Sequence, residues 1–132
     1  MTFDITQFEL EDTATLTVQN AKDDGDLLVD GKPVTIRLYG SGSEQYMRAE
    51  HRAINAATTR MQAAFRGKAV KNQAELSQKD LAEKLAACTA SIDNFPIDPL
   101  ALYSNNKLGY IRKQVVKFLD DDANFTKDSA TN

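Results

Sequence analysis

The spacing of the apolar residues changes once along this chain, at the glycine- and serine-rich residues 40–43. Before that point, apolar and polar residues alternate in residues 13–19 and again in residues 34–39, a period of two that is typical of half-buried strands. Asp-Gly pairs, which favour tight turns, lie between these segments. The pattern predicts an antiparallel meander over about residues 13–39, with residues 3–10 as a candidate edge strand.

After residue 43 the apolar residues recur at helical spacing. Ser41 and Glu44 have the spacing of a capping box, in which each side chain bonds a backbone N–H of the first turn. Gly67 and Pro96 are typical helix breakers. The helices that we expect span about residues 43–65, 81–92, 98–103 and 110–119.

Strands followed by helices in a chain of 132 residues indicate a single α+β domain. We predict a small N-terminal antiparallel β-meander followed by three to four helices, over residues 1–125. Residues 126–132 lack any periodicity, so we expect a disordered tail there. No apolar run approaches the roughly 20 residues that cross a bilayer, and the N-terminus does not resemble a secretory signal.

Charge is distributed unevenly along the chain. Residues 1–30 hold eight acids and one base, whereas residues 48–71 hold six bases and one acid. Such asymmetry occurs in chains that contact nucleic acids or proteins, and also on ordinary solvated helices. The pI of about 5.1 and the absence of tryptophan argue against a nucleic-acid-binding surface.

The chain offers few residues for catalysis or metal binding. His51 is the only histidine and has no second histidine or cysteine near it in the sequence, and Cys88 stands at an apolar helical position. The acidic segment from Asn20 has glycine at Gly31, where a calcium loop needs a bidentate glutamate. We therefore expect no catalytic, metal-binding or cofactor-binding residue. A single cysteine also favours a reducing, cytoplasmic setting.

The candidate protein-binding residues lie in the first predicted helix. They are three basic and two apolar side chains: Arg48, Arg52, Arg66, Met47 and Met61. The arginines could steer an acidic partner, and methionine adapts well to varied partner surfaces. Met47 and Met61 also continue, through Ile54, a stripe that recurs every seven residues, and side chains at this spacing more often belong to a buried core.

Three segments, in this order, resemble the tail assembly chaperones of long-tailed bacteriophages. The first is LVDGKPVTIRLYG at residues 28–40, which leads into a serine-started helix with Arg48, Arg52 and Asn55. The second is LAACT at residues 85–89. The third is residues 99–125, ending in QVVKFLDDDANF, which is similar to the family's Q-V-x-x-F-x-x-D-x-x-N-F close. The resemblance covers roughly residues 28–125.

This resemblance implies a protein without a catalytic site that binds the tape measure protein, keeps its helices soluble and recruits tail tube subunits. It implies action in the cytoplasm of the infected bacterial host and absence from the mature virion. It leaves a homo-oligomer open, and predicts neither a membrane nor a nucleic acid as partner. Two alternatives remain from the sequence: a structural tail-completion or head–tail connector protein retained in the virion, and a nucleic-acid-binding regulator.

Overall fold

The computed structural model describes residues 3–67 and 73–127, and these form an α+β fold. The predicted fold class is confirmed. The elements in chain order are η1 (Ile5–Phe8), β1 (Thr13–Thr17), β2 (Leu28–Val29), β3 (Lys32–Pro33), β4 (Thr35–Tyr39), α1 (Glu44–Phe65), α2 (Gln73–Ala87), β5 (Thr89–Asp93), α3 (Pro99–Ser104), η2 (Asn106–Leu108), α4 (Gly109–Leu119) and η3 (Asp122–Phe125).

The main sheet is antiparallel, with the strand order β1-β4-β5. Thr13 pairs with Tyr39 and Thr17 with Thr35, as a β1–β4 pairing of the two alternating segments requires. The meander predicted over residues 13–39 supplies only two strands of this sheet. The apolar residues Leu28 and Val29 form β2, which pairs with β3 in a separate small hairpin, and the sheet takes its third strand from β5 instead.

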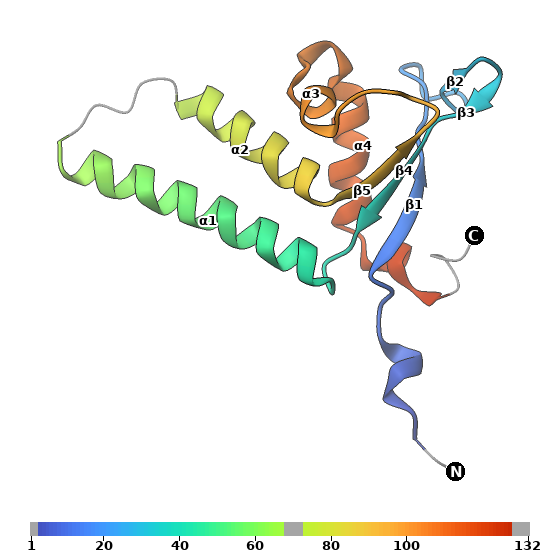
Figure 1. Ribbon diagram of the computed structural model, residues 1–132, viewed down its shortest axis with the longest axis horizontal. Helices are drawn as coiled ribbons and strands as arrows, with labels where there is room; N and C mark the ends of the chain where they lie inside the picture. Colours follow the sequence, from blue (N-terminus) through green and yellow to red (C-terminus); the bar gives the residue numbers. More distant parts are fainter. Residues whose placement is uncertain (1–2, 68–72, 128–132) are drawn as a thin grey trace.

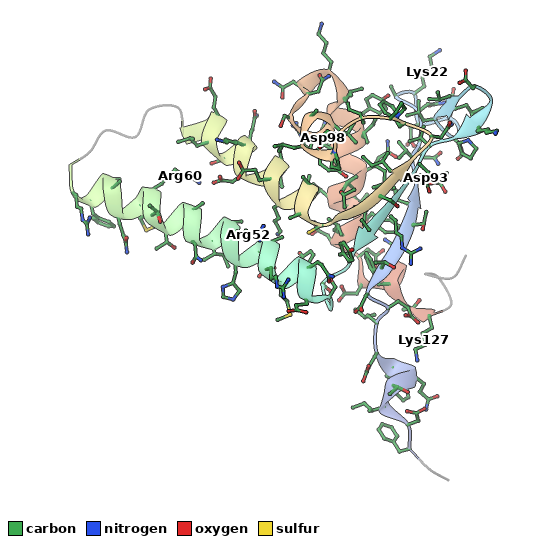
Figure 2. The ribbon with its side chains drawn as sticks, viewed as in Figure 1. Lys22, Arg52, Arg60, Asp93, Asp98 and Lys127 are labelled. Atoms are coloured by element: carbon green, nitrogen blue, oxygen red, sulfur yellow. The ribbon has the colours of Figure 1, made fainter. Side chains whose placement is uncertain are left out.

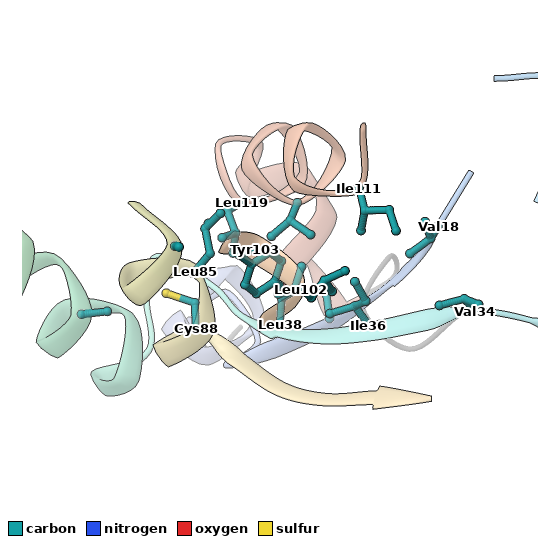
Figure 3. Packing of buried hydrophobic residues seen from close by; sticks show 14 of the residues in the cluster. Val18, Val34, Ile36, Leu38, Leu85, Cys88, Leu102, Tyr103, Ile111 and Leu119 are labelled. Atoms are coloured by element: carbon teal, nitrogen blue, oxygen red, sulfur yellow. The ribbon is translucent and has the colours of Figure 1, made fainter. Parts of the chain in front are cut away.

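Helices α3 and α4 cover one face of this sheet (Figure 1). The side chains between sheet and helices form the core, drawn in Figure 3. Its largest fully buried members are Tyr103, Phe125, Ile36, Leu38, Leu102, Ile111, Val18, Val34 and Val115. The opposite face of the sheet carries polar residues such as Thr15, Arg37 and Ser91, which are exposed. The alternating pattern of the strands therefore predicted their buried and open faces correctly.

Helices α1 and α2 form a hairpin that extends away from the sheet (Figure 1). Ser43 begins α1, because its hydroxyl accepts the Tyr46 N–H at 3.1 Å. The predicted capping box at Ser41 is wrong: the Ser41 hydroxyl donates to Asp122 at 2.7 Å instead. At the other end Gly67 adopts φ +77°, a left-handed conformation that glycine accepts without strain and that ends the helix as predicted.

Two other local predictions need correction. Residues 3–10 do not form an edge strand, because Asp4 accepts the Thr6 N–H at 3.0 Å and starts the 3-10 helix η1. The helix predicted over residues 81–92 ends at Ala87, and Ile92 lies in β5, where its β-branched side chain pairs with Ile36. Alternation in residues 89–93 is too short to compete with the preceding helical pattern when read from sequence.

Helices α3 and α4 lie close to the positions predicted from the sequence. Asp98 caps α3 by accepting the Ala101 N–H at 3.2 Å, and Pro99 takes the first helical position. Helix α4 buries Ile111 and Val115. Within the described segments, no helix is both long and apolar enough to cross a membrane. The tail expected over residues 126–132 lies largely outside the described residues, which end at Lys127.

Candidate protein-binding face

Helix α1 turns small side chains toward α2. Ala49 is buried, and Ala53, Ala56 and Ala63 are half-buried on the same side of the helix. Alanine side chains let two helices approach closely, so this contact needs little apolar volume. Tyr46 is the exception among the large side chains of α1: it packs against the core, and Lys84 of α2 lies over its ring. The isoleucine, both methionines and the phenylalanine of α1 do not hold the hairpin together.

The large apolar side chains lie on the opposite side of α1 and face solvent. Met47 is 57% exposed, Ile54 55%, Met61 62% and Phe65 85%. We call these four residues the outer stripe. The interpretation of Met47 and Met61 as core residues, which their spacing favoured, is therefore wrong: both side chains are more than half exposed.

The predicted arginines lie beside the outer stripe, and all three are exposed. Arg48 is paired with Glu44 one turn earlier on the helix surface. Arg52 follows one turn later and lines a shallow groove of about 220 Å³ between α1 and α2. Arg66 stands at the far end of α1, where its backbone N–H bonds the last turn. The structure thus brings all five predicted residues onto the solvent-facing part of one helix.

A fourth arginine has a different role. Arg60 points toward α2 and forms an ion pair with Asp80, with side-chain exposures of 24% and 18% (Figure 2). Partial burial makes such a pair less screened than one in open solvent. It ties the far half of α1 to α2 and leaves the outer stripe facing away. Asp80 lies within α2.

Sequence reasoning missed Ile54 and Phe65 as members of the candidate binding face. Ile54 was assigned to the same stripe as Met47 and Met61, so the seven-residue spacing already contained the signal. A repeat of seven keeps an apolar seam on one side of a helix and is the spacing that a partner helix reads. Periodicity alone does not distinguish such a seam from a face buried within the chain.

The cysteine considered above as a possible nucleophile lies in the core. Cys88 is fully buried, and burial raises the pKa of its thiol to about 11. Tyr103 is also buried, and burial raises the pKa of its hydroxyl to about 12. The Tyr103 hydroxyl lies 2.7 Å from the Thr89 hydroxyl. A thiol with so high a pKa stays protonated near neutral pH and is a poor nucleophile.

His51 is exposed on α1. Among the residues that the structure describes, no group of three or more histidine, cysteine or acidic side chains is arranged to hold a metal ion. Acids are unfavourable at a helix C-terminus, and two of the three at residues 120–122 have internal partners. Asp121 accepts the Ala123 N–H at 3.0 Å, and Asp122 accepts a hydrogen bond from the Ser41 hydroxyl.

The C-terminal segment that carries the resemblance is occupied with holding the fold together. The Gln114 side chain clamps the backbone of Gln19, accepting its N–H at 2.7 Å and donating to its carbonyl oxygen at 2.9 Å. Phe118 meets Phe125 edge to face, with ring centroids 5.4 Å apart. The Asn124 side chain donates to the Phe118 carbonyl at 3.0 Å. These three side chains therefore help to hold the fold together.

Comparisons of this chain with protein-family models, with curated proteins and with solved structures found no significant match.

Proposed function

We propose that this protein is a tail assembly chaperone of a long-tailed bacteriophage, and that the outer stripe of α1 binds helical segments of the tape measure protein. The observation that carries the proposal is the exposure of Met47, Ile54, Met61 and Phe65 along one helix. Large apolar side chains that are contiguous and exposed mark interaction sites on monomers. The three segments that resemble the chaperone family point to the identity of the partner.

The chemistry of the stripe suits an amphipathic helix. Apolar residues every seven positions match the seam along which two helices pack. Two of the four side chains are methionines, whose unbranched chains adapt to different partner residues, as a chaperone of a long and varied helix requires. Arg52 and Arg66 flank the stripe and would favour acidic residues on the partner.

The experiment is co-expression with the tape measure and tail tube proteins of the same phage, followed by pull-down. We expect co-purification and a larger soluble fraction of the tape measure protein. A double variant, Ile54→Ser with Met61→Ser, should lose both effects, because it replaces exposed apolar contacts by polar groups. Leu28→Ser is the matched control, since Leu28 is 56% exposed on β2, away from α1.

The other outcomes favour the alternatives. Presence of the protein in purified virions would assign it to the structural tail-completion or connector class. Binding to duplex DNA with a steep dependence on salt would support a nucleic-acid-binding regulator. If the double variant still co-purifies with the tape measure protein, the binding site lies elsewhere than on α1.

A further inference from the structure

A second apolar segment is exposed at the N-terminus, and we call residues 3–12 the arm. It leaves the body beyond the point where the Glu11 N–H donates to the Phe125 carbonyl at 2.7 Å, and it extends away from the sheet and helices (Figure 1). Phe3, Ile5 and Phe8 are 76%, 64% and 69% exposed, and the rings of Phe3 and Phe8 stack on each other at 5.8 Å.

The arm is also strongly acidic. Its charged residues are Asp4, Glu9, Glu11 and Asp12, and it carries no base. Asp4 accepts hydrogen bonds from the Thr6 hydroxyl and backbone N–H, which lower the pKa of its carboxyl and fix the turn of η1. The arm is therefore a preformed projection with negative charge. Its Leu10 packs against the core, whereas Phe3, Ile5 and Phe8 are largely exposed.

A groove with the complementary character lies between α2 and α4. Its volume is about 490 Å³, with Leu81 and Val116 as its apolar residues. Its basic residues are Arg112, Lys113 and Lys117 on α4. Asp120 and Asp121 lie at its other end, where α4 terminates.

Some of the charged side chains of the groove have partners among the described residues of the chain and others do not. Arg112 donates to the Tyr103 carbonyl at 3.1 Å, and Asp121 caps η3. Neither Lys113 nor Lys117 forms an ion pair with any residue in the described parts of the chain. Two free lysines beside exposed apolar surface therefore suit an acidic, apolar segment.

We propose that the arm of one copy docks in the α2–α4 groove of a second copy. Phe3, Ile5 and Phe8 would cover Leu81 and Val116, with the acids of the arm near Lys113 and Lys117. The arm and the groove are different surfaces, so the contact is head-to-tail, and each copy can give one arm and receive another. Such a contact closes when two copies exchange arms, and it otherwise builds larger rings or open chains.

The proposal is independent of the tape measure partner, because it uses neither α1 nor its outer stripe. Its test is the mass of the full chain in solution, measured by light scattering after gel filtration over a range of concentrations. We expect dimers or larger assemblies at low salt that dissociate as salt rises, since the contact is partly electrostatic.

Two variants test the arm and the groove independently. Phe3→Ser with Phe8→Ser removes the apolar residues of the arm, and Lys113→Glu with Lys117→Glu reverses the groove. All four positions are exposed, so both variants should fold with unchanged melting temperatures. Each variant alone should be monomeric. An equimolar mixture should form a one-to-one heterodimer, because one variant keeps an intact groove and the other an intact arm.

Other results would overturn the proposal. A wild-type chain that stays monomeric at all concentrations would mean that the arm is free or docks on its own chain. Assemblies that persist in both variants but disappear in Ile54→Ser would place the contact on α1. A mixture that remains monomeric would contradict the pairing of arm with groove.

Discussion

Helices α1 and α4 are both amphipathic by sequence, yet they bury opposite kinds of side chain. Helix α4 turns Ile111, Val115 and Leu119 into the core, where each is at most 4% exposed. Helix α1 buries Ala49 and leaves its isoleucine and both methionines in solvent. An apolar stripe therefore indicates which side of a helix packs against something. It does not indicate whether the packing partner is another part of the same chain or a different protein.

The sharpest way to test this contrast uses one isoleucine from each helix. Ile111→Ala should lower the free energy of unfolding by about 3 kcal/mol, because it removes buried volume and leaves a cavity. Ile54→Ala should change it by less than about 0.5 kcal/mol, since the side chain is exposed and alanine favours the helix. Urea denaturation measures both. Similar losses at the two positions would contradict the assignment of the faces.

Phe125 is also part of the core beside α4. A substitution at Gly40 tests how closely the Phe125 ring packs against the backbone there. A Cβ at residue 40 would lie 2.5 Å from the Phe125 ring. Gly40→Ala should therefore cost about 2 kcal/mol through overpacking. Gly42→Ala is the matched control, because the nearest side-chain atom, in Leu10, would lie 3.9 Å away. Thermal and urea unfolding should show the difference, and a silent Gly40→Ala would mean that Phe125 packs less closely.

A smaller effect is expected where a buried hydroxyl loses its partner. Thr89→Val leaves the Tyr103 hydroxyl without the hydrogen bond at 2.7 Å, at a cost of about 1–2 kcal/mol. Thr58→Val makes the same chemical change on exposed α1 and should cost a few tenths. The comparison is made by urea denaturation. Equal costs would show that the Thr89 hydroxyl is not a buried partner.

Two buried groups with raised pKa values make stability depend on pH in alkali. The buried Cys88 thiol has a pKa of about 11 instead of 9.0. The unfolded chain therefore loses the thiol proton first, and stability falls as pH rises from about 9 toward 11. The buried Tyr103 hydroxyl extends the loss toward pH 12, its pKa being raised from 10.0 to about 12.

Cys88→Ala isolates the contribution of the thiol. The stability of the variant should decline less than that of the wild type between pH 9 and 11, with no change in the pH dependence below that window. Unfolding curves at a series of pH values provide the measurement. Parallel pH profiles for the two proteins would show that the thiol is not held protonated by the fold.

Much of the fold could be predicted because local signals agree with it. Alternation identified β1 and β4, and the Asp98 cap located the start of α3 to within one residue. The strand β5 was missed, because its pairing with β4 is set by residues more than fifty positions earlier in the chain. The position of η1 was missed because a single aspartate cap outweighs a weak alternation.

The candidate site could be predicted in its residues but not in its geometry. Arg48, Arg52 and Met61 stood out by charge and spacing. Their exposure depends on α2, whose contact with α1 uses alanines and so leaves larger residues outside. Alanine is only weakly apolar. A prediction that gives more weight to large apolar side chains therefore places the wrong side of α1 against the rest of the chain.

The most direct test of the central claim, that the chain's own fold leaves the outer stripe open for a partner, is the reactivity of a thiol at position 54. Cys88 is buried and unreactive, so Ile54→Cys adds the one accessible thiol of the chain. Alkylation should be nearly as fast in the folded isolated protein as in the urea-unfolded chain, and much slower in the complex with the tape measure protein. Slow alkylation of the isolated protein, or equal rates with and without the partner, would contradict the account.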